Sequence, residues 1–422
     1  DVWVYTRWDV PSLRAALAEG DPALYLLTNS RGLPASAAAA LNGQAARELM
    51  TAARAAERNL LVVSRSDSTL RGHFPVEVDA LRQALETEQG APFDGVCLIP
   101  AFPEAGRFTI GDVQWVAEGD TLYPAAQTPY ARDDTFGFQH SVLPRWIEEK
   151  TRGRVRADEV VCISLEHLRV GGPSVVADLL QKVTGGRCVV VNAAAYADLD
   201  LFVAGLRQAL SAGKRFLFRS AAPFIKTLAG LEDRPLLTAA EIVAGRAAGG
   251  GLILFGSHVP KSTAQLEQVR ALPHIHTVEL CVRRVLHEAE RQREVLRVVR
   301  SLNAALAQGS DALLFTSREV VRGTDADDSL AIARAVSSAL TEVCAGVRPV
   351  PRYLLGKGGI TSSDLASRGL NAARARVLGQ VLPGVPVWRP DGGRWPGIPF
   401  VVFPGNVGEH DAVAAVVQML RP

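Results

Sequence analysis

The segment SRSDSTLRGH, residues 64–73, brings side chains of three different chemistries close together in the chain. Asp67 supplies a carboxylate, Arg71 supplies a guanidinium, and the hydroxyls of Ser68 and Thr69 lie between them. A small polyol acid needs these groups, because hydroxyls pair with donors and acceptors and the planar guanidinium binds a carboxylate through two hydrogen bonds. Ser and Asp also commonly cap a following helix, so the local pattern leaves both explanations open.

A second loop of this kind, IPAFPEAGR at residues 99–107, follows the apolar run VCLI. Its Glu104 and Arg107 offer an acceptor and a guanidinium, and its two prolines limit the conformations of the free loop. A loop that is already stiff loses less conformational entropy when it binds a ligand. The alternative is a surface ion pair between Glu104 and Arg107, which would contribute little to stability.

A third candidate segment, FGFQHS at residues 136–141, precedes the helix-like stretch LPRWIEEKT. His140 and Ser141 could bind hydroxyls of the same ligand, although a lone histidine more often serves as a structural hydrogen-bonding group. The three segments together predict a site for a small anionic polyol, in which Asp67 and Arg71 are assigned to catalysis. The predicted substrate-binding residues are Ser68, Thr69, Arg71, Glu104, Arg107, His140 and Ser141.

Three glycine-bearing turns in the carboxyl-terminal half each follow a strand-like run. They are LILFGSHVPKST, YLLGKGGITSSDLA and FVVFPGNVGEHDA, and a helix-like stretch follows each of them. Glycine lets the backbone approach phosphate oxygens closely, and helix N-termini offer unpaired N–H groups. Because the carboxyl ends of parallel strands share one edge of a sheet, the three turns would converge on one phosphate-bearing ligand. The predicted cofactor-binding residues are Ser257, His258, Gly358, Gly359, Ile360, Thr361, Gly405 and Asn406.

The same turns lack two common nucleotide-binding motifs. None is a Walker A loop, since that motif requires G-x-x-x-x-G-K-[ST] and Lys357 here precedes the glycine pair. None is the G-x-G-x-x-G fingerprint, which argues against a dinucleotide site. Asp364 could bind Mg²⁺ through water or interact with the dipole of its helix, and we favour the dipole. The metal ligands stay unknown at this point.

The composition is that of an ordinary globular protein of 422 residues, 48% hydrophobic and 21% charged. A net charge of +2 gives no electrostatic reason to expect a nucleic acid partner. The five cysteines are an odd number, and those inside apolar runs are expected to be buried thiols, as in a reducing cytoplasm. No apolar stretch approaches the ~18 residues of a membrane span, so we expect no membrane partner.

The elements that must position these residues alternate along the chain. Short apolar runs of strand length alternate with Ala- and Leu-rich stretches of helical spacing, which predicts α/β layers with largely parallel sheets. Because segment 230–250 is rich in turn residues, we predict two domains, 1–240 and 241–422, with a cleft between them. Strands are expected at 60–63, 96–99, 160–163, 188–191, 252–255, 313–316, 353–355 and 400–403, and helices at 35–58, 75–85, 175–183, 199–210 and 285–306.

Six motifs in order along the chain resemble the four-carbon acid sugar kinase family, formerly a family of uncharacterised domains. The resemblance implies a sugar-acid-binding domain followed by a nucleotide-binding domain. It implies transfer of a phosphoryl group from ATP, with Mg²⁺, to the terminal C4 hydroxyl of erythronate, threonate or 3-oxo-tetronate. It also implies that Ser257, the turn at 358–361 and Gly405 contact ATP. The motifs are SDSTLRGH, PAFPEAGR, TPYARDDTFGFQHS, GSHVPKST, GGITSSDLASRGL and FPGNVGEHDA.

One departure from the family concerns the catalytic base. Family members usually begin with an Asp-rich strand and turn of the Asp-Asp-x-Thr-Gly type, and this sequence starts just after the place where that segment should stand. The leading candidate base is therefore expected outside the printed residues, with Asp67 as the fallback. Two alternatives stay open: a sugar-acid sensor that binds nucleotide without turnover, and a nicotinamide-dependent hydroxy-acid dehydrogenase. A homodimer is the one macromolecular partner considered.

Overall fold

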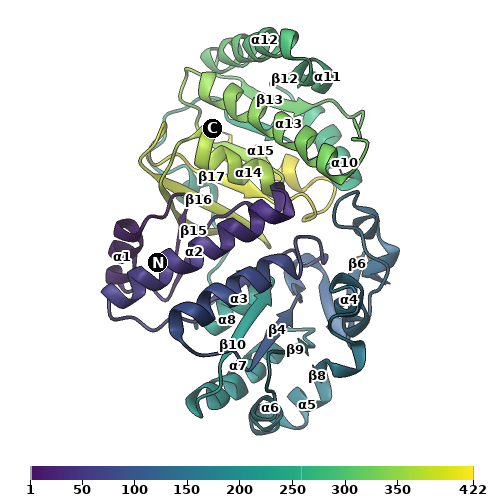
Figure 1. The fold of residues 1–422 in the computed structure, drawn as a ribbon. Helices are drawn as coiled ribbons and strands as arrows, with labels where there is room; N and C mark the ends of the chain where they lie inside the picture. Colours follow the sequence, from purple (N-terminus) through teal and green to yellow (C-terminus); the bar gives the residue numbers. More distant parts are fainter. Residues whose placement is uncertain (1, 258, 422) are drawn as a thin grey trace. The chain divides into compact units, whose positions relative to one another are not determined.

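The chain forms two compact units in the structure, a computed structural model that describes residues 2–257 and 259–421 (Figure 1). The amino-terminal unit comprises Asp9–Pro22 and Leu33–Glu232. The carboxyl-terminal unit comprises Asp1–Trp8, Ala23–Gly32 and Asp233–Pro422. The chain passes from one unit to the other for the last time between Glu232 and Asp233, inside the turn-rich segment 230–250 where we expected the domain boundary. The first 32 residues contribute to both units, which differs from a single division of the chain near residue 240.

A parallel sheet of five strands forms the centre of the amino-terminal unit, in the order β3-β10-β4-β9-β8. Alternate residues of β4 enter different cores: Val96 and Leu98 pack on one face, and Cys97 and Ile99 pack on the other. Both faces are therefore covered, as its continuous apolar sequence predicted. The strands are β3 (Val63–Arg65), β4 (Gly95–Ile99), β8 (Val161–Ile163), β9 (Arg187–Val191) and β10 (Phe216–Ser220).

Helices cover the two faces of this sheet. Buried side chains of α2, α3 and α4 pack on one face, and those of α5, α6, α7 and α8 pack on the other. A small antiparallel sheet, β5-β6-β7, follows the loop that contains Glu104. The bounds are α1 (Val10–Glu19), α2 (Ala35–Ala55), α3 (Val76–Gln89), α4 (Leu143–Lys150), α5 (Leu165–Arg169), α6 (Gly172–Gln181), α7 (Tyr196–Ser211), α8 (Ala222–Leu228), β5 (Arg107–Ile110), β6 (Val113–Glu118) and β7 (Thr121–Pro124).

A sheet of nine strands forms the centre of the carboxyl-terminal unit, in the order β12-β13-β11-β14-β17-β16-β15-β1-β2. The first five strands of this order are parallel, whereas β17-β16, β16-β15 and β15-β1 pair antiparallel. The strands are β1 (Val2–Tyr5), β2 (Ala23–Leu26), β11 (Leu252–Phe255), β12 (Ile275–Leu280), β13 (Asp311–Thr316), β14 (Leu354–Lys357), β15 (Arg374–Leu382), β16 (Val385–Asp391) and β17 (Phe400–Phe403). Two largely parallel sheets flanked by helices confirm the predicted fold class.

Buried side chains of α12 and α13 supply ten of the 29 buried residues in one core of this unit. The helix expected at 285–306 is divided at His287, whose backbone is extended. The helices are α9 (Ala239–Ile242), α10 (Pro260–Arg270), α11 (Val282–Leu286), α12 (Glu288–Ala307), α13 (Ala326–Gly346), α14 (Gly359–Asp364) with a π-helical continuation (Leu365–Gly369), and α15 (Ala412–Leu420).

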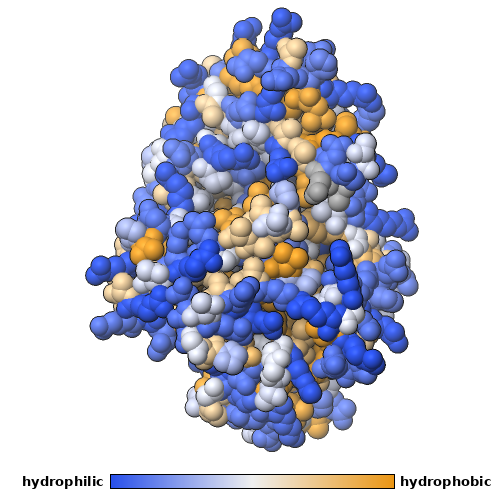
Figure 2. Space-filling model, in the orientation of Figure 1, coloured by the Kyte–Doolittle hydropathy of each residue, from blue (hydrophilic) through white to orange (hydrophobic). Residues whose placement is uncertain are grey.

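Polar residues predominate on the molecular face drawn in Figure 2, and the apolar residues there occur in small groups. No helix within the described residues has the length and apolar character needed to cross a membrane.

Candidate functional site

The three glycine turns lie at the carboxyl ends of β11, β14 and β17, which are neighbours in the sheet. Backbone hydrogen bonds join each turn to the next. The N–H groups of Gly256 and Ser257 donate to the carbonyl of Lys357, each at 3.2 Å. The N–H of Gly358 donates to the carbonyl of Phe403 at 2.8 Å. The convergence expected from the strand pattern is therefore present in the carboxyl-terminal unit.

Side chains fill the space between the turns where glycine has no Cβ. A methyl group at Gly405 would lie 2.9 Å from Ser257 Oγ, and one at Gly256 would lie 2.0 Å from Thr361 Oγ1. Ser262 Oγ lies 2.9 Å from Ser257 Oγ and 3.0 Å from the carbonyl oxygen of Gly405. Gly256 and Gly405 are thus required for packing of one turn against another.

Gly359, the first residue of α14, differs from these glycines. It is exposed, its φ lies outside the positive range, and a Cβ there would have no described atom within 4 Å. Gly358, by contrast, has a φ of 120°. Of the described glycines without a positive φ, Gly359 is the one at which a Cβ would have no neighbour within 4 Å. Open space beside a glycine in a strand-to-helix turn suits close approach of a ligand to the backbone.

The other predicted cofactor residues have different surroundings. Thr361 is buried and faces Gly256, and Ile360 Cγ2 lies 3.8 Å from the position of a Cβ at Gly32. Asn406 is half-buried. His258 lies outside the described residues. Ser257, Gly358, Thr361 and Gly405 are therefore the predicted residues that the structure brings together.

Arg318, which the sequence analysis did not identify, orders the first turn. It follows β13 and donates to the carbonyl oxygen of Ser257 at 2.9 Å, and to the carbonyl and hydroxyl oxygens of Thr316 at 2.9 and 2.8 Å. Burial lowers the pKa of Arg318. The signal was a polar pair, Ser317 and Arg318, at the carboxyl end of an apolar strand.

Asp364 does not have the role that we favoured for it. It is the last residue of α14, beyond the first turn where the helix dipole stabilises a negative charge, so the dipole interpretation was wrong. Its carboxylate instead accepts hydrogen bonds from Asn29 at 2.8 Å and from Ser337, and it pairs with Arg368 at 2.8 Å. These partners join β2's following turn, α13 and α14 within the carboxyl-terminal unit.

In the amino-terminal unit, the Asp67 loop folds around its own carboxylate. Asp67 accepts hydrogen bonds from the backbone N–H of Thr69 at 3.0 Å and from the Thr69 hydroxyl at 2.9 Å. Arg71 Nε and Nη2 each lie 2.9 Å from Asp67 Oδ2. Arg71 Nη1 also lies 3.6 Å from Asp133. The loop therefore orients Arg71, whose side chain is only 11% exposed and whose guanidinium lies between two carboxylates.

Tyr130 brings the guanidinium groups of two separate motifs together. Arg71 lies over its ring at 4.9 Å and Arg107 at 5.7 Å from the ring centroid. Arg107 Nη2 donates to the Tyr130 hydroxyl at 3.4 Å. Burial lowers the pKa of Arg107 and raises the pKa of Tyr130. Sequence reasoning missed Tyr130 as a site residue, although it lies inside the quoted segment TPYARDD.

Glu104 and Ser68 point elsewhere. Glu104 accepts a hydrogen bond from the hydroxyl of Tyr196, at the start of α7, and has no ion pair with Arg107 among the contacts of the described residues. The surface ion pair considered as the alternative is thus absent from them. Ser68 is buried, and its carbonyl accepts a hydrogen bond from Gln114 at 2.8 Å.

His140 and Ser141 have structural contacts. The side chain of His140 is exposed, and its backbone N–H donates to Glu149 at 3.2 Å. Ser141 is buried, and its hydroxyl accepts a hydrogen bond from the N–H of Ala126 at 2.8 Å. No described hydrogen bond or ion pair connects either side chain to Asp67 or Arg71. These two residues do not join the cluster around Tyr130 through direct contacts.

Arg219 places a third buried guanidinium at the same sheet edge. It is in β10, which pairs with both β3 and β4, and it is 2% exposed. Its Nη1 lies 3.5 Å from Glu77, and its guanidinium lies 5.4 Å from the ring centroid of Phe74. Burial lowers the pKa of Arg219. A methyl group at Gly72 would lie 3.2 Å from Arg219 Nη2, so this glycine of the Asp67 loop leaves room for it.

Comparison with protein families agrees with this division of the chemistry. Residues 4–228 match a family model described as a sugar-binding N-terminal domain. Residues 252–413 match one described as a nucleotide-binding C-terminal domain. The chain belongs to the four-carbon acid sugar kinase family. The predicted resemblance is thereby confirmed.

Curated relatives of this family member carry specific names. The chain is 27% identical over 400 aligned positions to a D-erythronate kinase of Heliobacterium modesticaldum, covering 89% of this chain and 84% of the relative. It is 28% identical over 440 positions to a D-threonate kinase of Bordetella bronchiseptica, covering 99% and 91%.

Two solved structures share the fold of this chain. A Salmonella typhimurium protein described as a putative tRNA synthase aligns with a TM-score of 0.65 at 18% identity, covering 98% of this chain and 92% of that one. A Haemophilus influenzae protein aligns with a TM-score of 0.56 at 16% identity, covering 99% of both. At these identities the likeness concerns the fold alone.

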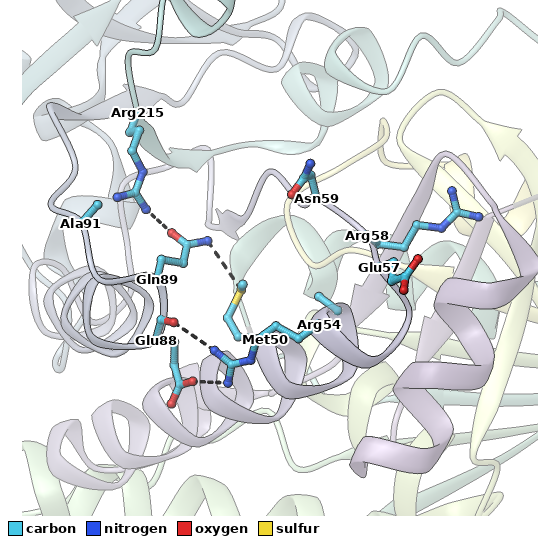
Figure 3. Close-up of a pocket in the computed structure, with 10 residues that line it drawn as sticks. Met50, Arg54, Glu57, Arg58, Asn59, Glu88, Gln89, Ala91 and Arg215 are labelled. Atoms are coloured by element: carbon cyan, nitrogen blue, oxygen red, sulfur yellow. Dashed lines mark hydrogen bonds and ion pairs between the residues drawn. The ribbon is translucent and has the colours of Figure 1, made fainter.

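An open pocket of about 550 Å³ in the amino-terminal unit contains none of the predicted site residues (Figure 3). Arg54 of α2 pairs with Glu88 of α3 at 2.5 Å across it, and Arg215 donates to Gln89. Gln89 Nε2 in turn lies 3.7 Å from Met50 Sδ. The pocket shares no lining residue with the cluster around Tyr130.

Proposed function

We propose that the protein is an ATP-dependent kinase that transfers the γ-phosphoryl group to the terminal C4 hydroxyl of a four-carbon sugar acid. The observation that carries the proposal is the junction of three glycine turns at one sheet edge, with Gly359 open beside them. The names of the two curated relatives support a substrate of the erythronate or threonate type, and 3-oxo-tetronate belongs to the same chemical class.

ATP is the proposed cofactor of the carboxyl-terminal unit. The exposed Gly359 and the neighbouring Gly358 and Ser257 would contact its phosphates. Mg²⁺ would supply charge neutralisation of those phosphates when bound. Among the described residues no three His, Cys, Asp or Glu side chains gather as a metal cluster. The lack of such a cluster does not argue against Mg²⁺, because the ion commonly keeps several waters and binds through one or two carboxylates together with the substrate phosphates.

The sugar acid is the proposed ligand of the amino-terminal unit. Arg71 and Arg107 would bind its carboxylate, and the stacking of both on Tyr130 fixes the orientation of the two guanidinium groups. Asp67 would first position Arg71, because its oxygens accept from Arg71 and Thr69. As the fallback base within these residues, Asp67 would have to exchange one of these hydrogen bonds before it accepted the hydroxyl proton.

ATP consumption by the purified full chain, measured with a panel of four-carbon sugar acids and Mg²⁺, tests the proposal. We expect turnover with at least one acid of the erythronate or threonate type and none with three- or six-carbon acids. Stabilisation by NAD⁺ without stabilisation by ATP would contradict the proposal. Binding of ATP and acid without turnover would identify a sensor in place of a kinase.

A further inference from the structure

Lys357, the last residue of β14, contacts all three glycine turns. Its carbonyl accepts the hydrogen bonds from Gly256 and Ser257, and Gly358 follows it directly. Its side chain extends to the third turn, where Nζ donates to the carbonyl of Pro404 at 2.6 Å.

The amine of Lys357 is buried without a counter-charge. The residue is 0% exposed, and Nζ lies 4.3 Å from the ring centroid of Phe403. Within the described part of the chain, no carboxylate forms an ion pair with it. A buried ammonium with a single hydrogen-bond acceptor leaves donors unsatisfied, so burial shifts the equilibrium toward the neutral amine when the turns are empty.

The groups on the surrounding elements do not change this balance. On α10, Lys261 adds a like charge, and burial followed by this repulsion holds the pKa of Lys357 well below its ordinary value. On α14, the carboxylate of Asp364 is already engaged by Asn29, Ser337 and Arg368. Beside β11, Arg318 is a second cation, which donates to Ser257. β11 and β17 themselves carry apolar residues only.

We propose that Lys357 is a positioning residue that takes up a proton when a nucleotide's phosphates bind to the glycine turns. The inference rests on the proposed nucleotide binding and extends it to the proton balance of that step. The amine gains one proton from solvent on binding and returns it when the nucleotide leaves. The phosphates supply the negative charge that the described residues do not, and opposite charge favours the ionised form. The ammonium then strengthens its hydrogen bond to Pro404 and fixes the Gly405 turn.

Isothermal titration calorimetry of the full chain with ADP and Mg²⁺ tests this inference. ADP binds without turnover, and titrations in buffers of different ionisation enthalpy give the number of protons taken up. On binding ADP, the wild type should take up more protons than Lys357→Met, with a difference of up to about one proton per site. The methionine side chain has a similar length to lysine but no amine. Lys182→Met, an exposed site in the amino-terminal unit, is the matched control and should behave as the wild type.

The pH dependence of ADP affinity gives a second measurement that needs no variant. A group whose pKa is higher in the complex favours binding at low pH. The Kd of the wild type for ADP should therefore rise with pH, by up to about tenfold per pH unit where Lys357 titrates. The inference would be overturned if the wild type and Lys357→Met took up the same number of protons. If that variant does not fold, a wild-type Kd for ADP that is independent of pH would overturn it. Absence of ADP binding to the wild type would instead refute the proposed function.

Discussion

Gly359→Ala separates ligand binding from folding. The structure gives the new methyl group no described neighbour within 4 Å and no positive φ to strain. Replacing glycine by alanine at such a position removes freedom from the unfolded chain and should raise the free energy of unfolding by about 0.4–1 kcal/mol. If phosphates approach the backbone at this residue, the same methyl group would occupy their space. Overpacking of a close contact typically costs about 1–3 kcal/mol, which predicts an increase of roughly 5- to 150-fold in KM for ATP.

The assay has two parts: steady-state KM for ATP and for the sugar acid, and thermal unfolding without ligands. Gly43→Ala is the matched control, because a Cβ at this α2 residue would meet only the flexible end of Arg47, at 3.4 Å. It should stabilise the protein and leave both KM values unchanged. The reasoning fails if Gly359→Ala binds ATP as the wild type does, or if it lowers the melting temperature as a packing glycine would.

Two further predictions concern the amino-terminal unit. Arg71→Ala should raise KM for the sugar acid by about 10- to 100-fold and change KM for ATP far less, since a charged hydrogen-bonded contact is worth about 1.5–3 kcal/mol; equal effects on both would contradict its assigned role. Asp198 is the second case: burial alone would raise its pKa, but hydrogen bonds from Arg169 and the N–H groups of Ala194 and Ala195 lower it. Its stabilisation is present above the ordinary pKa of an aspartate and is lost as pH falls through the lowered value. Denaturant unfolding should therefore give Asp198→Asn a free energy of unfolding about 1–3 kcal/mol lower than that of the wild type at neutral pH. As the pH falls, the stability of this variant should decrease less than that of the wild type. An equal decrease in both proteins would refute this prediction.

Strands covered on both faces were predictable because their apolar residues are continuous. The runs 252–255 and 400–403 coincide with β11 and β17, and the glycine turns follow them as expected. β10 was not predicted as a strand, because Arg219 interrupts the apolar pattern of FLFRS. A charge inside a central strand is costly unless it is paired, so the interruption itself indicated an arginine with a buried partner.

Pairings between distant parts of the chain were not predictable. β1 joins the nine-stranded sheet by pairing with β15, where Trp3 lies opposite Arg376. Nothing in the sequence near residue 3 indicates that partner. The antiparallel strands β15 and β16 were also missed, since bulges between Val377 and Gly379 and between Gln380 and Leu382 break their alternation.

The glycines show a similar limit. Sequence alone assigned Gly405 to phosphate contact. In the structure, the side chain of Ser257 occupies the space that a Cβ at Gly405 would need. Only the surroundings of each glycine distinguish packing from open space, and these come from residues far away in the chain. The Tyr130 cluster likewise depends on three separate loops.

The most direct measurement is the ³¹P NMR spectrum of the product formed from ATP, Mg²⁺ and erythronate or threonate by the full chain. Phosphorylation of the terminal hydroxyl would give a phosphate monoester signal coupled to the two C4 protons. A signal coupled to a single C2 or C3 proton, or release of inorganic phosphate alone, would contradict the account.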